Sequence, residues 1–390
     1  MTGPLRRLAQ TARVLDHRLG RACGLRQVLI EARTPMNLAV LRPVFAPLLS
    51  DPRIQLRVTG VPRADLDLAF EEAGVSALKI SRERARWTRF DLYVNSDPWE
   101  AVTLRRAARH MNFFHGVAGK YNLDCPSGLP LGLERYDVVA FPNEGRMANY
   151  VAAGLIPASR AVLVGYPKAD ALVAFASRPE DAATALGLDG SRPTVLYAPT
   201  FSPASSLNLA GEAIVEVLTT SRCNVIVKLH DRSLDPDPRY NGGIDWRVRF
   251  ARFADSGRFL FAESGDSTAY VQASHVIVTD HSSIGFEFCA ADRPIIIYDA
   301  PTLAETARIN PEKLALLRSA GDVVRTPQEL TRALAGALAD PDRRSPERRK
   351  AASQVFYDLG GATARALAAV YELLDLPPAT VTPNHRAAGA

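Results

Sequence analysis

Several polar side chains directly follow apolar runs of the kind that form buried parallel strands. They are Thr200, then Lys228, His230 and Arg232, and then the turn Asp280-His281-Ser282-Ser283. Because the carboxyl ends of parallel strands meet at one edge of a sheet, we expect these groups to lie close together. Hydroxyl, imidazole and cationic groups in one place are suited to holding a phosphate-bearing ligand.

The turn that ends in Ser282 and Ser283 is followed by an apolar stretch, Ile284–Ala291, that predicts a helix. Either serine is a good N-cap for that helix, and capping alone explains both residue types. The free N–H groups and the positive dipole end of a helix also bind phosphate. A phosphate site and a plain helix cap are therefore both open for this turn.

Lys228 and His230 alternate along the strand predicted just before them, so their side chains are expected on one face of it. A positive pair at this edge of the sheet would neutralise the charge of a diphosphate. The alternative is a solvated strand end that binds no ligand.

A histidine also ends an apolar run in the first half of the chain, in the segment Phe113–Lys120. An imidazole at the carboxyl end of a strand faces a ligand cleft and titrates near neutral pH, so His115 can act as a general base. Gly116 and Gly119 permit a ligand to approach the backbone closely. The alternative is a buried structural histidine in a strand-to-loop turn.

The elements that must position these groups alternate between strands and helices, which predicts parallel sheets with helices on both faces. Predicted strands are 27–31, 54–59, 90–94, 111–114, 137–141 and 161–164, then 194–198, 224–229, 259–262, 275–278, 295–298 and 322–324. Predicted helices include 35–49, 65–73, 100–108, 209–219, 268–273, 327–339, 346–358 and 361–375. The expected fold class is α/β, with two Rossmann-like domains facing a central cleft.

The domain boundaries follow from composition and from turn residues. We expect a basic amphipathic helix at 1–25, an N-terminal Rossmann-like domain at 26–180, a C-terminal Rossmann-like domain at 190–376 and a disordered tail at 377–390. The basic helix could lie on an anionic membrane surface, or it could pack its leucines on the protein itself, which is the ordinary case.

Composition excludes several classes of protein. The net charge of +5 is small for 390 residues, and no nucleic-acid-binding motif is visible, so no nucleic-acid partner is expected. The four cysteines are scattered without a C-x-x-C pair, which argues against a zinc site or a disulfide framework. With no apolar run long enough to span a membrane, we expect a cytoplasmic protein, or a peripheral one at the inner face of the cell membrane.

Cofactor motifs are missing from the places where they would be expected. Neither half contains G-x-G-x-x-G after its first strand, and no G-x-x-x-x-G-K-[ST] segment occurs. Hydride transfer to a dinucleotide and P-loop hydrolysis therefore lose their usual support. No metal-ligand cluster is apparent, so we expect no cofactor and no obligatory metal.

Five segments stand in a fixed order: Phe113–Lys120 (FFHGVAGK), Val164–Leu172 (VGYPKADAL), Val195–Phe201 (VLYAPTF), Lys228–His230 (KLH) and Val278–Phe288 (VTDHSSIGFEF). In this order they resemble the CDP-glycerol glycerophosphotransferase family, the teichoic-acid primases and polymerases of cell-wall and capsule synthesis. His281 stands where that family usually has Tyr, and Glu287 where it usually has Asp. The resemblance implies the glycosyltransferase-B architecture, in agreement with the two-domain prediction.

The resemblance also implies an activity: transfer of glycerol phosphate, or a related polyol phosphate, from a CDP-linked donor to a hydroxyl of a lipid-linked or polymer acceptor. The N-terminal domain (26–180) would be the acceptor domain and the C-terminal domain (190–376) the nucleotide-donor domain. His115 and His230 would be the catalytic residues, with Gly116 and Lys120 on the acceptor side. Donor-binding residues would be Thr200, Lys228, Arg232, Asp280, His281, Ser282, Ser283 and Glu287.

Two other classes of function stay open at this point. One is a nucleotide-sugar glycosyltransferase or UDP-sugar 2-epimerase on the same architecture, because fold does not decide chemistry. The absence of a second acidic cluster near His115 disfavours the epimerase. The other is a non-catalytic scaffold in an envelope-synthesis complex, which the combined presence of His115, His230 and the serine pair disfavours.

Overall fold

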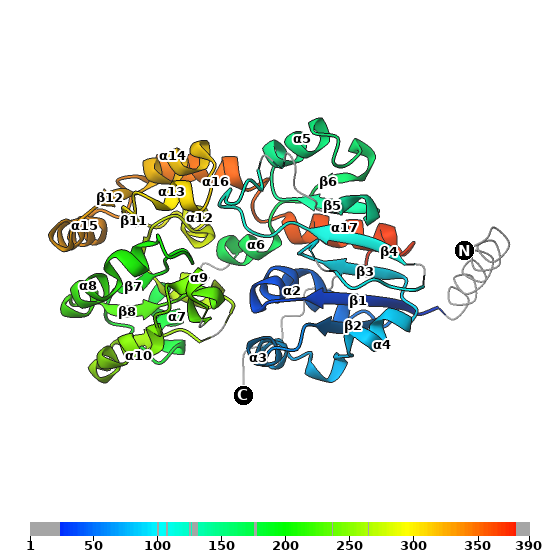
Figure 1. Cartoon of the computed structure of the whole chain (residues 1–390), viewed down its shortest axis with the longest axis horizontal. Helices are drawn as coiled ribbons and strands as arrows, with labels where there is room; N and C mark the ends of the chain where they lie inside the picture. The colour runs from blue at the N-terminus through cyan, green and yellow to red at the C-terminus, as the bar shows by residue number, and fades with distance from the viewer. Residues whose placement is uncertain are drawn as a thin grey trace.

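The structure is a computed structural model that describes residues 24–99, 101–106, 108–124, 126, 132–174, 178–235, 237–263 and 265–379. Within these ranges the chain forms two domains, each built on a six-stranded sheet with helices on both faces (Figure 1). All strand pairs of the two sheets are parallel. The predicted α/β class with two Rossmann-like domains is confirmed.

The N-terminal sheet has the strand order β2-β1-β3-β4-β5-β6. After β2 the chain returns across β1 to form β3, so the topological switch point of this sheet lies between β1 and β3. The strands are β1 (Arg26–Ala32), β2 (Ile54–Gly60), β3 (Leu92–Asn95), β4 (Arg109–Phe113), β5 (Val138–Phe141) and β6 (Ala161–Leu163).

The C-terminal sheet has the order β12-β11-β10-β7-β8-β9, which puts its switch point between β7 and β10. Each predicted strand is present in the two sheets, with ends that differ from the prediction by at most two residues. The strands are β7 (Thr194–Tyr197), β8 (Asn224–Val227), β9 (Phe259–Phe261), β10 (Val276–Thr279), β11 (Ile295–Tyr298) and β12 (Asp322–Val324).

Helices bury apolar side chains against both faces of each sheet. The N-terminal sheet is covered on one face by α2 (Pro35–Leu49), α3 (Ala64–Glu72) and α17 (Ala362–Leu373), and on the other by α4 (Arg82–Trp87) and α5 (Glu144–Ala152). The C-terminal sheet is covered on one face by α8 (Ser206–Thr220), α10 (Trp246–Phe250) and α15 (Pro327–Ala339). Its other face packs on α6 (Pro167–Ala174), α7 (Pro179–Ala185), α11 (Thr268–Ala273), α12 (Ser283–Ala290), α14 (Pro311–Ala320) and α16 (Ser345–Val355).

One predicted helix is wrong, and several helices were not predicted, among them α4, α5 and α14. Residues 101–106 and 108 are not helical, although 100–108 has the alternation of leucine, alanine and arginine typical of a surface helix. The backbone N–H of Val102 instead donates to the buried carboxylate of Glu31, and that of Arg105 donates to the Arg86 carbonyl. These tertiary hydrogen bonds hold the segment in an extended path beside the unpredicted helix α4.

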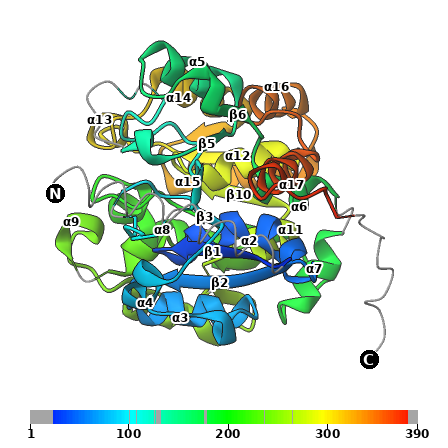
Figure 2. The ribbon, with the colours of Figure 1, turned by 90° about the vertical axis from the view of Figure 1, so that its right-hand side faces the viewer.

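The last helix crosses back to the N-terminal domain. Although the predicted C-terminal domain extends to residue 376, α17 buries Ala366 and Val370 in the core of the first sheet (Figure 2). Asp170, on α6, accepts hydrogen bonds from the backbone N–H groups of Gly360, Ala362 and Thr363 at the start of α17. The predicted helix at 1–25 and the tail at 377–390 lie almost wholly outside the described residues.

Candidate active site between the two domains

Thr200 and Asp280 stand at the switch point of the C-terminal sheet, after β7 and β10. The Asp280 carboxylate accepts hydrogen bonds from the backbone N–H groups of Thr200 (2.8 Å), His281 (2.6 Å) and Ser206 (2.9 Å), and from Ser206 Oγ (3.0 Å). Thr200 Oγ1 donates to the carbonyl of His281. These bonds fix the two loops against each other, so Asp280 shapes the site and has little accepting capacity left for a ligand.

The two serines of the turn have different surroundings. Ser282 is the N-cap of α12: its Oγ accepts from the N–H of Gly285 at 3.4 Å and lies 2.9 Å from Thr279 Oγ1. The helix-cap interpretation is therefore confirmed for Ser282, which is buried. Ser283 is the first residue of α12 and is half-buried, so its hydroxyl and the first N–H groups of the helix are the parts of this turn available to an anion.

The neutral ring of His230 is protonated on Nε2. Its Nδ1 accepts a hydrogen bond from the backbone N–H of Arg232 at 3.1 Å, so Nε2 bears the hydrogen in the neutral ring. The ring packs on Phe201 with 4.4 Å between centroids. Burial, together with the nearby charges of Lys120 and Lys228, holds the pKa of His230 well below its usual value. His230 is therefore a neutral hydrogen-bond donor at physiological pH.

The two cations that flank His230 differ in exposure. β8 ends at Val227, so Lys228 and His230 lie beyond the strand, and the predicted alternation on one strand face does not apply. Lys228 is buried, its Nζ donates to the carbonyl of Leu229 at 2.6 Å, and burial lowers its pKa. The interpretation of this segment as a solvated strand end is wrong for Lys228. Arg232 is exposed, with its guanidinium 5.1 Å from the centroid of the Phe201 ring.

His115 follows β4 and has one ring nitrogen committed to the backbone. Nδ1 lies 2.5 Å from the carbonyl oxygen of Ser96, which only accepts, so the hydrogen is on Nδ1 and the lone pair is on Nε2. The ring is half-buried and lies close enough to His230 for its charge to lower the pKa of that residue. The next residue, Gly116, has φ of +74°, and its carbonyl accepts from Arg146 Nη2 at 3.0 Å. His115 is thus half-buried and not buried, while its bond to Ser96 also suits the alternative of a structural histidine in a strand-to-loop turn.

The loop after His115 brings Lys120 across to the C-terminal domain. Lys120 Nζ lies 3.4 Å from Thr200 Oγ1 and 5.4 Å from the centroid of Phe201, so this residue, expected on the acceptor side, reaches the expected donor site. Burial lowers the pKa of Lys120 to about 8, which leaves the amine mostly protonated at pH 7. The loop turns at Gly119, where φ is +65° and a Cβ would lie 2.5 Å from Asp124 Oδ2.

His281 links the two domains. Its Nε2 lies 2.7 Å from the carbonyl oxygen of Ala118, so Nε2 donates, and Nδ1 is buried without a hydrogen-bond partner. The same loop is also tied to the C-terminal domain by backbone hydrogen bonds from Asn310 to Gly119 (2.8 Å) and from Tyr121 to Ala307 (2.9 Å). His281, expected to bind donor, thus holds the loop of His115 in place.

We expect this contact to weaken in acid. Burial lowers the pKa of His281 from 6.5 to about 4, so its contribution to stability is complete above pH 6.5 and is lost as the pH falls towards 4. Between pH 7 and pH 5 the loss should be about 2 kcal/mol, because a proton on Nδ1 would be buried without an acceptor. Urea denaturation at several pH values measures it. In His281→Gln, whose amide can donate to Ala118 without titrating, this part of the pH dependence should vanish; an unchanged dependence would contradict the assignment.

Glu287 is buried in a cluster that sequence reasoning did not foresee. Its side chain is 1% exposed and forms an ion pair of 2.7 Å with Lys168 Nζ on α6. Ser267 Oγ donates to Glu287 Oε2 at 3.1 Å and accepts from Lys168 Nζ at 2.5 Å. Glu287, expected to bind donor, is therefore engaged within the protein, and a ribose hydroxyl of the donor would have to compete with Lys168 for its carboxylate.

The structure therefore gathers most of the predicted residues but divides them by role. Lys120, His230 and Arg232 pack around Phe201, Lys120 also contacts Thr200, and the charge of His115 acts on His230. Asp280, His281, Ser282 and Glu287 hold loops and helices together. Lys168 and Phe201 were inside the motifs VGYPKADAL and VLYAPTF but received no role from the sequence.

The described residues contain neither a cluster suited to a metal ion nor a helix suited to a membrane. Among the residues that the structure describes, no group of three or more His, Cys, Asp or Glu side chains could hold a metal ion. None of the described helices has both the length and the apolar character needed to cross a membrane.

Two facing Rossmann-like domains place the chain among proteins of the glycosyltransferase-B fold. The model of the CDP-glycerol:poly(glycerophosphate) glycerophosphotransferase family matches residues 131–372, more than half of the chain. The chain belongs to this family, and it is an enzyme of the CDP-glycerol glycerophosphotransferase class. A comparison with the curated proteins finds no match by sequence.

Solved structures resemble the whole chain at low identity. A variant of the wall teichoic acid polymerase TagF soaked with CDPG has a TM-score of 0.66 at 14% identity, covering 96% of this chain and 99% of that one. The MnaA–UDP structure from S. aureus has a TM-score of 0.57 at 13% identity, covering 90% and 98%. UDP-GlcNAc 2-epimerase from Neisseria meningitidis has a TM-score of 0.56 at 15% identity, covering 89% and 100%. At these identities the likeness establishes the fold.

Proposed function

We propose that the protein moves glycerol phosphate, or a related polyol phosphate, from a CDP-linked donor to a hydroxyl of a lipid-linked or polymer acceptor in cell-envelope or capsule synthesis. The observation that carries the proposal is that loops from opposite domains meet where Lys120 contacts Thr200 and Phe201, and that backbone hydrogen bonds leave a lone pair on Nε2 of His115 in one loop and a hydrogen on Nε2 of His230 in the other. Membership of the family supports the donor. The resemblance in fold to TagF, a wall teichoic acid polymerase that was soaked with CDPG, agrees with it.

The donor diphosphate would lie at the switch point of the C-terminal sheet. The N–H groups at the start of α12 and the hydroxyl of Ser283 would bind its oxygens, and Lys120 and Arg232 would balance its charge. Thr200 would orient Lys120 through the contact between Nζ and Oγ1. Asp280 and Ser282 would keep this geometry rigid without touching the donor.

The reaction is a substitution at the phosphorus that carries the polyol. Nε2 of His115 would take the proton of the acceptor hydroxyl as its oxygen attacks that phosphorus. The bond from this phosphorus to the bridging oxygen breaks, and CMP leaves with the electron pair. The N–H of His230 and the cations Lys120 and Arg232 would stabilise the charge that develops on the leaving oxygen.

We also propose that the protein meets its acceptor at the inner face of the membrane. Attachment of the protein to the inner face of the membrane would bring a lipid-linked acceptor within reach, and the arginine-rich sequence at residues 1–25 suits an anionic surface. Sedimentation with anionic vesicles, compared between the full chain and a chain lacking residues 1–23, tests this part.

A donor panel tests the proposal as a whole. CDP-glycerol at about 100 times its Kd should stabilise the protein by about 2.7 kcal/mol, seen as a higher Tm, while UDP- and GDP-linked sugars should not. With an acceptor-containing membrane extract, CDP-glycerol should give CMP. Preferential stabilisation by UDP-sugars, without CMP release, would instead favour a nucleotide-sugar enzyme. The MnaA–UDP structure and the UDP-GlcNAc 2-epimerase resemble this chain in fold alone.

A further inference from the structure

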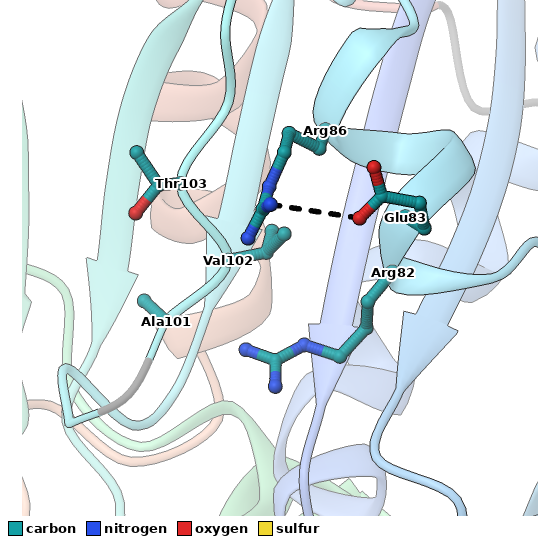
Figure 3. A pocket seen from close by; sticks show the side chains of 6 residues that line it. All are labelled: Arg82, Glu83, Arg86, Ala101, Val102 and Thr103. Carbon is teal, nitrogen blue, oxygen red and sulfur yellow. Dashed lines mark ion pairs between the residues drawn. The ribbon is translucent and has the colours of Figure 1, made fainter.

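A second polar cavity lies in the N-terminal domain, away from the residues assigned to the donor. It has a volume of about 150 Å³ and lies between helix α4 and the segment 101–103 (Figure 3). Arg82, Glu83 and Arg86 line it from the helix, and Ala101, Val102 and Thr103 line it from the segment. Its volume is enough for a phosphate group with the carbons attached to it.

A buried carboxylate builds this cavity. Glu31, near the end of β1, is 2% exposed; its Oε1 lies 3.0 Å from Arg82 Nε, and its Oε2 accepts from the backbone N–H of Val102 at 2.8 Å. Tyr93 of β3 also donates to Oε2. Because Glu31 and Tyr93 are on β1 and β3, they stand at the switch point of the N-terminal sheet, where open α/β sheets bind ligands. Because the buried Glu31 carboxylate binds both Arg82 and the backbone of segment 101–103, it fixes the shape of the cavity.

The charges of the cavity favour an anion. Arg82 and Arg86 are four residues apart on α4, so their side chains lie about 6 Å apart on one face, and both extend from the helix towards the segment 101–103, Arg86 to Val102 and Arg82 to the Ala101 side (Figure 3). Guanidinium groups bind phosphate through paired N–H groups, and Thr103 adds a hydroxyl. Two carboxylates oppose these charges: Glu31, which pairs with Arg82 Nε, and Glu83, whose 3.5 Å pair with Arg86 is exposed at 70% and 41% and is easily displaced.

The wider surroundings reinforce this charge. Between positions 82 and 109 the sequence has seven arginines and four acidic residues, a local excess of positive charge in a chain that is close to balanced. Strand β3, whose Tyr93 donates to Glu31, is followed by Ser96, whose carbonyl accepts from His115. A chain-like ligand anchored in the cavity would thus follow the carboxyl edge of the N-terminal sheet towards the general base.

We propose that this cavity binds a phosphate group of the acceptor, with Arg86 and Arg82 as its ligands and Thr103 as a further donor. The inference rests on the proposed function, since it assigns to the acceptor a phosphodiester or phosphomonoester one or more units away from the reacting hydroxyl. Such an anchor positions the hydroxyl and gives the enzyme a preference for acceptors that already carry phosphate.

The test compares two arginines of the same helix. Arg86→Gln should raise the KM for a soluble glycerol-phosphate oligomer about tenfold, with kcat and the KM for CDP-glycerol unchanged. Arg84→Gln, which removes the same charge from an exposed position outside the cavity, should change these values less than about twofold. Titration of the protein with the oligomer in the absence of donor, followed by 31P NMR, should show a tenfold lower affinity for Arg86→Gln. This experiment measures binding at the site independently of turnover.

Several results would overturn this assignment. Equal oligomer affinity in Arg86→Gln and wild type would remove the site, and an equal loss in Arg84→Gln would reduce it to general electrostatics. If Arg86→Gln loses binding to phosphatidylglycerol vesicles but still binds the oligomer, the ligand of the cavity is a lipid headgroup instead. If wild type binds the oligomer through Arg86 but releases no CMP from CDP-glycerol, the proposed function fails while the anion site stands.

Discussion

Replacing His115 with alanine should lower the rate of CMP release about 1000-fold and leave donor affinity within about twofold of wild type. A positioned general base contributes about 10²–10⁴-fold, and the Ser96 carbonyl fixes the His115 tautomer with the lone pair on Nε2. The donor would keep its contacts with Lys120, Arg232 and the start of α12. Initial rates of CMP release and the shift in Tm with CDP-glycerol measure the two effects separately.

His110→Ala is the matched control for this prediction. His110 is on the same strand, β4, and its Nδ1 also lies 3.0 Å from a backbone carbonyl oxygen, that of Ala108. It stands at the opposite end of the strand from the site, so its loss should change kcat less than about threefold once the folded fraction is accounted for. Turnover like that of wild type in His115→Ala would remove the proposed base. A similar loss in both variants would point to damage of β4.

The strands could be predicted because each is buried on both faces. Runs such as Val276–Val278 and Ile295–Ile297 are continuously apolar, and in a parallel sheet that pattern leaves little choice. Once the strands were predicted, Thr200, His230 and the Ser282 turn could be placed together at the carboxyl edge of the sheet without any knowledge of contacts. This part of the site follows from local pattern and topology.

The roles of the gathered residues could not be predicted in the same way. His281 and Ala118 are 163 positions apart, and Lys168 and Glu287 are 119 apart, so neither contact leaves a local pattern. The helix prediction for 100–108 failed for the same reason, because the distant Arg86 carbonyl takes the Arg105 N–H that a helix would have used and the buried Glu31 holds Val102. The residues were visible in the sequence, while their partners depend on the packing of two domains.

The VGYPKADAL motif illustrates what such a pattern can hide. Lys168 pairs with Glu287 below α12, and Asp170 caps the start of α17 on the other domain. Gly165 has φ of +92°, and a Cβ there would lie 2.7 Å from the Tyr357 carbonyl oxygen. The motif therefore joins the two domains, and its polar residues stabilise the junction from which the catalytic loops extend.

Breaking the pair of Lys168 and Glu287 should be the most destabilising single change at this junction. Glu287→Gln would leave the Lys168 ammonium, 2% exposed, without a counter-charge, which costs about 3–5 kcal/mol for a buried pair. Lys168→Met should have an effect of similar size, because it leaves the Glu287 carboxylate buried. The double variant removes both charges and should recover at least half of the loss, since two neutral side chains need no partner. Urea denaturation of the four proteins measures the coupling.

The double variant also separates the structural role of Glu287 from a role in holding the donor ribose. If the carboxylate serves only the pair, the double variant should bind CDP-glycerol within about threefold of wild type, because α12 and its first N–H groups stay in place. If Glu287 leaves Lys168 to bind a ribose hydroxyl, donor affinity should fall about tenfold or more even where stability has recovered. Additive losses in the two single variants, with no recovery in the double, would contradict the pairing itself, because charges that do not interact cannot be coupled.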